Sequence, residues 1–233
     1  MAKKRILLSV HPTDREQIWG IAYLLLSIFL LPSLLDLLNE SLPFTLSKAW
    51  INFLYFAVNF LCILWIFHGF FLRSLYYIGQ NAGTFLLGVL LGFGSYWLSS
   101  WLIGLAYGFF FPGFSNLNDG SISAMLHDNF WVMAIGTVFL VPVAEEALHR
   151  GLIFGSLYQK SHMAGYLLSA AIFSAVHIFG YTGVYTPLHL VLAFLQYIPA
   201  GLTLCWAYRL SGSIYAPILI HATINAISLI SLR

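Results

Sequence analysis

Long apolar segments alternate with short polar ones along most of the chain. A helix needs roughly 20 residues to cross about 30 Å of hydrocarbon, and seven segments approach or exceed that length. We expect membrane-spanning helices at Ile18–Leu38, Trp50–Leu72, Gly83–Phe110, Phe130–Tyr158, Ala164–Phe179, Leu188–Tyr208 and Ile214–Leu232. The stretch Pro112–Ser121 carries the Pro, Gly and Asn signals of a loop. The pattern predicts an all-α fold, a polytopic transmembrane helical bundle of about seven helices, or six to eight if the short fifth segment merges or splits.

Composition supports a membrane protein. The chain has 60% hydrophobic and 8% charged residues, against roughly 25% charged residues in soluble domains. Such a chain cannot cover a water-facing surface, so its expected surroundings are the lipid bilayer. The formal net charge of +2 and the lack of a long basic run argue against a nucleic-acid partner. Cys62 and Cys205 lie inside apolar segments, where we expect small buried hydrophobes rather than a disulfide framework.

The basic residues predict an orientation. Cytoplasmic loops of membrane proteins are enriched in Lys and Arg. With a cytoplasmic N-terminus, the basic residues on or towards the cytoplasmic side are Lys3, Lys4, Arg5, Arg15, Arg73, Arg150, Lys160 and Arg209. Lys48 and Arg233 then fall on the other side. We therefore expect an integral multi-pass protein, of the cell membrane if the source is bacterial, with its N-terminus in the cytoplasm.

The stretch Pro142–Arg150, PVAEEALHR, places charged groups inside an otherwise apolar segment. Each charge at bilayer depth costs roughly 2.5–3.5 kcal/mol on insertion scales, so such residues indicate function. Glu146 and Arg150 stand at i, i+4 with the acid first, the favourable order for an ion pair. Glu145 points about 100° away and shares its face with His149. The two glutamates therefore need not do the same work, and Pro142 can loosen the helix beside them.

Two further polar pairs follow on later segments. FSAVH contains Phe173 and His177, and HATIN places His221 and Asn225 on one helix face about 6 Å apart along the axis. Either pair alone would suit an ordinary hydrogen bond between helices. However, the midpoints of the predicted helices place Glu145, both histidines and Asn225 at similar depth. This agreement predicts a common site.

EEALHR, FSAVH and HATIN, in this order on successive segments, resemble the EExxxR, FxxxH and HxxxN motifs of the CPBP family. That family comprises type II CAAX prenyl endopeptidases and bacteriocin-processing or self-immunity proteins, also called Abi proteins. The resemblance covers residues 130–232 and implies a glutamate-dependent intramembrane endopeptidase. It implies a CPBP-like catalytic core at 129–233. The apolar pattern and the expected orientation add a cytoplasmic N-terminal segment at 1–17 and N-terminal transmembrane helices at 18–128.

The resemblance also implies roles for individual residues. Glu145 and His177 would activate the attacking water, and His221 and Asn225 would stabilise the oxyanion. The residues that would shape the site are Glu146, Arg150 and Phe173. The substrate would be a membrane-anchored peptide or protein, such as a prenylated CAAX-like C-terminus or a leader or bacteriocin-like peptide.

Several alternatives stay open. The resemblance favours chemistry without a metal or other cofactor, but Glu145, His177 and His221 are also able to ligate zinc and leave a position for water. No HExxH motif accompanies them. Two other functions fit the same residues: a non-catalytic self-immunity or binding protein of this fold, and a transporter in which acids and histidines relay protons.

Overall fold

The computed structural model describes residues 8–232, and the described residues form helices without any strand. The α-helices are α1 Asp14–Phe29, α2 Leu31–Ser41, α3 Lys48–Gln80, α4 Ala82–Phe110, α5 Leu117–Asp128, α6 Phe130–Ile135, α7 Val141–Glu146, α8 Gly155–Tyr158, α9 His162–Phe179, α10 Pro187–Ser211 and α11 Tyr215–Ser231. Two π-helical stretches, η1 Gly136–Leu140 and η2 Ala147–Phe154, interrupt the run from α6 to α8. The predicted all-α class is confirmed.

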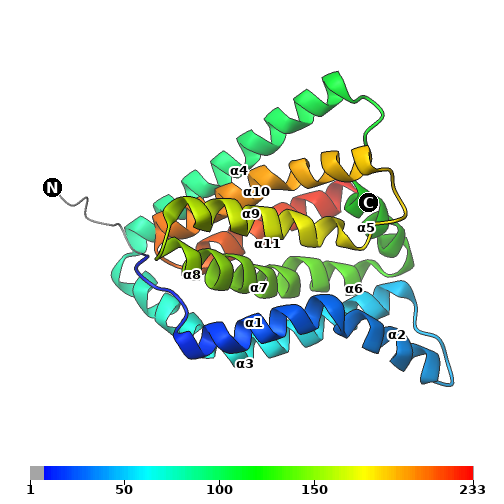
Figure 1. The fold of residues 1–233 in the computed structure, drawn as a ribbon, viewed down its shortest axis with the longest axis horizontal. Coiled ribbons are helices and arrows are strands. Elements are labelled where there is room, and N and C mark those ends of the chain that lie inside the picture. Colours follow the sequence, from blue (N-terminus) through cyan, green and yellow to red (C-terminus); the bar gives the residue numbers. More distant parts are fainter. Residues whose placement is uncertain (1–7, 233) are drawn as a thin grey trace.

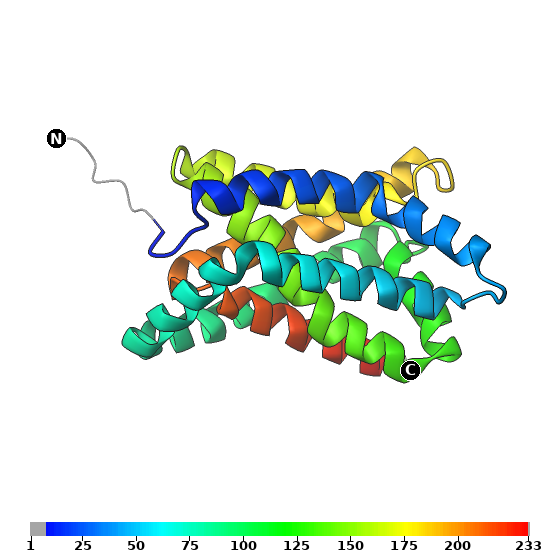
Figure 2. The same ribbon diagram turned by 90° about the horizontal axis from the view of Figure 1, so that it is seen from below.

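The long helices run roughly alongside one another as a bundle (Figure 1). The run from α6 to α8 contacts α3 and α11, while α10 packs against α9, α4 and α11. Helix α1 lies along α3 and also contacts η2 (Figure 2). The run that carries the polar cluster is therefore surrounded by other helices, and half of its most apolar window is buried.

Among the described residues, five helical runs are long and apolar enough to cross a membrane: α3, α4, the run Phe130–Tyr158, α9 and α10. The pair α1 and α2 makes a sixth span if it is counted as one bent crossing. Helix α11 is apolar but has only 17 residues. These seven apolar elements correspond to the seven segments expected from the sequence, so the protein is an integral, multi-pass membrane protein.

The first expected segment, Ile18–Leu38, is not one straight helix. It is divided at Leu30 into α1 and α2, which are bent by 50°. Pro32 lies in the first turn of α2. Its ring removes a backbone donor and collides with the carbonyl four residues earlier, so a helix that enters this position bends or ends. The expected segment is therefore a bent pair of helices, which makes one crossing only if the two helices are counted together.

Helix α5 occupies part of the expected loop. Its start is capped by Asn116, whose side-chain oxygen accepts hydrogen bonds from the backbone N–H groups of Asn118 and Asp119. Leu126 of α5 packs in a cluster with Met133 and other buried residues from the neighbouring helices. Asn, Asp and Gly in the first turn are typical of a loop, so the sequence did not predict this helix. The cap and the packing stabilise it.

The run Phe130–Tyr158 matches the fourth expected segment, but its backbone widens beside the charges. The backbone N–H of Val141 donates to the carbonyl of Gly136, five residues back. Pro142 follows in the first turn of α7 and supplies no N–H of its own. A π turn relieves the clash that proline imposes on a regular helix, and such turns are frequent at functional sites. The second π stretch, η2, contains both His149 and Arg150.

Small residues allow α10 to approach its neighbours closely. A Cβ atom on Gly201 would lie 2.7 Å from the Cα and from the Cβ of Ala170 in α9. A Cβ atom on Gly88 of α4 would lie 2.5 Å from the Cβ of Ser211 in α10. Close backbone approach at small residues is the usual way in which helices pack in membranes. These contacts set the spacing of the helices that surround the polar cluster.

This spacing can be tested with Gly201→Ala and the matched control Gly104→Ala. Gly201→Ala should lower the unfolding free energy by about 1–3 kcal/mol, because the methyl group has no room against α9. Gly104 lies in α4 with nothing within 4 Å of its Cβ direction, so its substitution should be neutral or stabilising by about 0.5–1 kcal/mol. Thermal unfolding in detergent measures both. Equal midpoints for the two variants would contradict the close packing of α9 and α10.

Candidate active site

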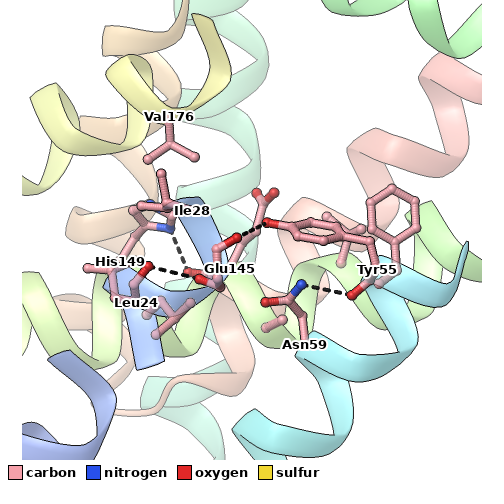
Figure 3. Close-up of a pocket in the computed structure, with 12 residues that line it drawn as sticks. Leu24, Ile28, Tyr55, Asn59, Glu145, His149 and Val176 are labelled. Atoms are coloured by element: carbon pink, nitrogen blue, oxygen red, sulfur yellow. Dashed lines mark hydrogen bonds between the residues drawn. The ribbon is translucent and has the colours of Figure 1, made fainter. Parts of the chain in front are cut away.

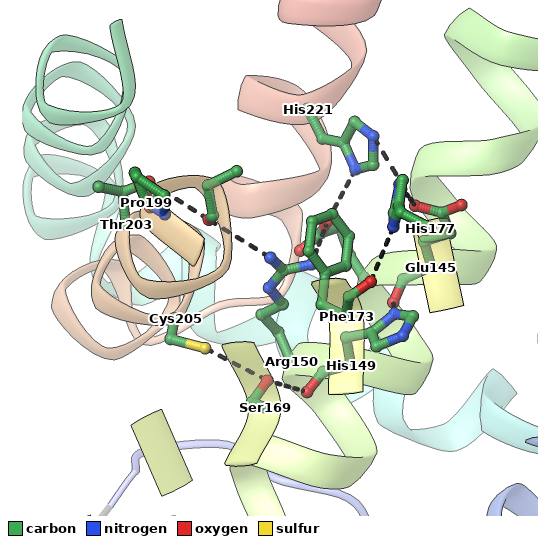
Figure 4. A network of polar contacts seen from close by, with 12 residues as sticks. Glu145, His149, Arg150, Ser169, Phe173, His177, Pro199, Thr203, Cys205 and His221 are labelled. Atoms are coloured by element: carbon green, nitrogen blue, oxygen red, sulfur yellow. Dashed lines mark hydrogen bonds and ion pairs between the residues drawn. The ribbon is translucent and has the colours of Figure 1, made fainter. Parts of the chain in front are cut away.

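Glu145 of α7 lies between two histidines from other helices. Its Oε2 atom is 3.9 Å from the Nε2 atom of His177 in α9 and 3.9 Å from the Nε2 atom of His221 in α11. Figure 4 shows the two imidazole rings directed at the carboxylate. The structure thus brings together three side chains that the sequence placed only at a similar depth.

Hydrogen bonds at the far sides of the rings assign the tautomers. His177 donates from Nδ1 to the backbone carbonyl of Phe173 at 2.8 Å. His221 donates from Nδ1 to Oε1 of Glu146 at 2.7 Å. A neutral imidazole carries one hydrogen, so each Nε2 then presents a lone pair towards Glu145. Because 3.9 Å exceeds a direct hydrogen bond, a single water molecule fits the role of a bridge between these groups.

Glu146 and Arg150 form the ion pair that their spacing predicts. Arg150 Nη1 donates to Glu146 Oε1 at 2.9 Å, and both side chains are fully buried. The second guanidinium nitrogen donates to the carbonyl of Ala200 in α10 at 3.4 Å. Since Arg150 is buried in the site, it does not belong to a cytoplasmic loop, and the orientation must rest on the other basic residues.

The same carboxylate oxygen of Glu146 accepts hydrogen bonds from Arg150 and from His221. Glu146 therefore has a second role that its i, i+4 spacing could not indicate: it orients the His221 ring. A carboxylate that holds one nitrogen of a histidine leaves the other nitrogen in a defined direction. For His221 that direction is towards Glu145.

The Phe173 ring packs at the centre of the site and is 3% exposed. The Arg150 guanidinium lies 4.2 Å from the ring centroid, a distance at which a cation is attracted to an aromatic face. The His177 ring is 4.3 Å away, centroid to centroid. Phe173 thus packs against both the ion pair and one histidine.

Asn225 lies in the same region, and its side chain forms a hydrogen bond with the backbone. Its Nδ2 atom donates to the carbonyl of Thr137 in η1 at 2.8 Å. Asn225 and Thr137 line the same cavity as Glu145. The carboxamide carries two N–H donors, and this bond uses one of them. The bond therefore anchors α11 to the π stretch just upstream of the two glutamates.

A cavity of about 680 Å³ opens at these residues. Glu145, His177, His221 and Asn225 line it, with further walls from α3, α4, α5 and α10. The volume lies within the range of roughly 300–1,000 Å³ that is usual for ligand pockets. A part of a peptide substrate has room to reach the carboxylate.

A smaller cavity of about 60 Å³ also borders Glu145 (Figure 3). Leu24, Ile28 and Tyr55 are among the residues that line it. His149 also faces it and is 3% exposed, with its Nδ1 donating to the backbone carbonyl of Glu145 at 2.9 Å. His149 therefore shares the surroundings of Glu145, as its helical phase predicted, and packs edge-on against Phe173.

Sequence reasoning missed two aromatic residues of the site. Tyr197 of α10 packs against the His177 ring in a tilted arrangement, and Tyr55 of α3 lines both cavities beside Glu145. A tyrosine hydroxyl at mid-membrane was the available signal for Tyr197, which follows Gln196 directly. Tyr55 lies outside the last hundred residues and offered no comparable signal.

Within residues 8–232, no three His, Cys, Asp or Glu side chains meet the geometry of a metal site. The triad nearest to such a site is Glu145 with the two histidines, whose Nδ1 bonds to acceptors resemble the outer contacts of metal-binding histidines. A carboxylate and two imidazoles are suitable ligands for zinc. The Glu145 oxygen and the two imidazole nitrogens would have to move to reach the ligand geometry of a bound zinc ion.

Comparison with known proteins finds a family match within the C-terminal half of the chain. Residues 127–227 match the family of Rce1-like type II CAAX prenyl endopeptidases. This part of the chain is similar to that family. The finding agrees with the CPBP resemblance, because the matched family is a family of membrane proteases that act on membrane-associated proteins. The match includes all seven candidate site residues, and no curated protein or solved structure matches the chain.

The buried ion pair gives a stability prediction. Arg150→Met should lower the unfolding free energy by about 3–5 kcal/mol, because it leaves the Glu146 carboxylate buried without its cation. The double variant Glu146→Met with Arg150→Met should recover part of that loss, since no charge is then stranded. Arg209→Met, at an exposed position, is the control. Thermal unfolding in detergent compares the variants, and an Arg150→Met midpoint equal to that of the control would refute the burial of this pair.

Proposed function

We propose that the protein is an intramembrane endopeptidase that hydrolyses a peptide bond with a water activated by Glu145 and His177. The observation that supports this most is the arrangement of one carboxylate oxygen 3.9 Å from two imidazole nitrogens at the wall of a large cavity. A carboxylate and a histidine lone pair are suitable acceptors for the protons of one water molecule.

In this mechanism the water lies between Glu145 and His177. Glu145 accepts its proton as the water oxygen attacks the peptide carbonyl carbon, which forms the C–O bond. The developing oxyanion receives hydrogen bonds from the second N–H of Asn225 and from Nε2–H of His221, with Glu146 holding the opposite nitrogen. The Nε2 proton of His221 is taken up from solvent in the cavity before the attack and returns to solvent after the C–N bond breaks. The proton on Glu145 then passes to the leaving nitrogen as the C–N bond breaks. No side chain becomes acylated.

We propose that this chemistry proceeds without a metal. A carboxylate and two histidines with fixed Nδ1 bonds are sufficient to accept and return the proton that hydrolysis moves. Zinc on Glu145, His177 and His221 is the alternative mechanism, in which the metal would lower the pKa of its bound water.

We propose a substrate that is a peptide close to a membrane-anchored end, either a prenylated CAAX-like C-terminus or a leader or bacteriocin-like peptide. We also propose a cytoplasmic N-terminus, now supported by Arg15, Arg73, Lys160 and Arg209. Lys48, at the start of α3, stays the one described basic residue that this orientation places on the other side. Four further basic residues of the orientation argument lie outside the described residues: Lys3, Lys4, Arg5 and Arg233.

Two substitutions test the mechanism. Glu145→Gln and His177→Ala should each lower the cleavage rate by about 10²–10⁴-fold, the usual contribution of a positioned acid–base group. Glu40→Gln changes an exposed carboxylate on α2 and should leave cleavage unchanged. The measurement is cleavage of candidate membrane peptides by purified protein, with equal amounts of folded variant. Full biological activity in Glu145→Gln would contradict the proposal and favour a non-catalytic immunity or binding protein.

The metal-free mechanism has its own test. Purified active protein should contain no stoichiometric zinc, and treatment with a zinc chelator should leave its cleavage rate unchanged. Elemental analysis of the preparation used in the cleavage assay gives the metal content directly. Stoichiometric zinc, with activity lost on removal and regained on addition, would establish the alternative mechanism instead.

A further inference from the structure

The His177 ring packs against two aromatic rings, which also contact each other. Phe173 lies on one side with a centroid distance of 4.3 Å and an interplanar angle of 51°. Tyr197 of α10 lies against it with a centroid distance of 4.4 Å and an angle of 34°. Phe173 belongs to the FxxxH motif on the same helix as the histidine. Tyr197 comes from a different helix and belongs to none of the three motifs.

Two contacts are needed to orient the imidazole ring of His177 with its Nε2 atom towards Glu145. The bond from Nδ1 to the carbonyl of Phe173 determines which edge of the ring faces the backbone. It does not prevent the ring from tilting about that bond. Packing of Tyr197 against the ring limits this tilt, since offset aromatic contacts of this length favour a defined arrangement. Together the two constraints leave Nε2 directed at Glu145.

Tyr197 is itself held in place. Its hydroxyl donates to Oδ1 of Asn116 at 3.3 Å, and Nδ2 of Asn116 donates to Gln196 at 2.9 Å. One turn further along α10, Gly201 meets Ala170 of α9 in close backbone contact. This approach brings α10 near enough for the Tyr197 ring to reach His177. The tyrosine is therefore fixed from both ends, by its hydroxyl and by the packing of its helix.

We propose that Tyr197 is a positioning residue that holds the His177 imidazole with its Nε2 atom towards Glu145. The ring of Tyr197 carries this role, and its hydroxyl assists by fixing the ring. The inference rests on the proposed function only for its effect on cleavage. The orientation of His177 is a property of the folded protein and can be measured without any substrate.

The test uses Tyr197→Leu, which removes the ring, and Tyr197→Phe, which keeps it. Tyr197→Leu should lower kcat by about 10–100-fold, since a displacement near 1 Å in a catalytic group can cost 10²-fold. Its KM should change little. Tyr197→Phe should stay close to wild type. Tyr185→Leu is the matched control: Tyr185 lies 5.3 Å from the ring of His189, and neither lines the large cavity.

Several outcomes would overturn the role. An unchanged kcat in Tyr197→Leu, or a change in KM alone, would show that the ring does not position His177. An equal loss in Tyr197→Phe would assign the effect to the hydroxyl instead, and an equal loss in Tyr185→Leu would make it nonspecific. If Tyr197→Leu does not fold, Tyr197→Met takes its place in the same comparison.

Nitrogen-15 NMR of labelled histidines separates this inference from the proposed function. His177, assigned through His177→Ala, should show the Nδ1–H tautomer in wild type and in Tyr197→Phe, and an averaged signal in Tyr197→Leu. An unchanged signal in Tyr197→Leu would overturn the positioning role even if the protein cleaves no tested peptide. Wild-type protein that cleaves nothing, with the NMR change present, would contradict the proposed function alone.

Discussion

The buried ion pair between Glu146 and Arg150 is the interaction on which the rest of the site depends. Two fully buried charges inside an apolar bundle cost several kcal/mol each unless their hydrogen bonds are satisfied. Here the partners of the pair come from several helices: the carbonyl of Ala200 in α10, the ring of Phe173 in α9 and Nδ1 of His221 in α11. Glu146 Oε2 and Arg150 Nε are buried without a hydrogen-bond partner, so the pair is only partly satisfied. The bonds that it does form connect α7 and η2 to α10 and α11 and hold these helices together around the site.

Because of this ion pair, the two adjacent glutamates have different contacts and different roles. Glu146 faces inward, is neutralised by Arg150 and orients His221. Glu145, about 100° around the helix, faces the cavity and has no opposing Arg or Lys within ion-pair distance among the described residues. The π turns on either side of α7 widen the backbone at these positions. The π turn before α7 ends next to Pro142, which has no backbone N–H to donate. The irregular backbone and the charged cluster therefore come from the same short stretch of sequence.

The sequence predicted much of this arrangement because the relevant rules are local. Apolar length located the membrane segments, and i, i+4 spacing located the Glu146–Arg150 pair. Similar depth indicated that Glu145, His177 and His221 belong together. The lateral contacts were not predictable in this way, because helical periodicity says nothing about which neighbour a face meets. Two such lateral contacts are the hydrogen bond between His221 and Glu146 and the packing of Tyr197 against His177. Helix α5 was missed because its Asn- and Gly-containing first turn is typical of a loop.

The central claim is that Glu145 serves peptide hydrolysis in the membrane, and the native substrate tests it most directly. The measurement compares protein termini in membranes that contain wild-type protein with those in membranes that contain an equal amount of Glu145→Gln protein. We expect at least one membrane-associated protein to carry a new terminus with wild-type protein and to remain uncut with Glu145→Gln. Identical termini in the two membranes, under conditions in which the wild-type protein performs its biological function, would contradict the claim.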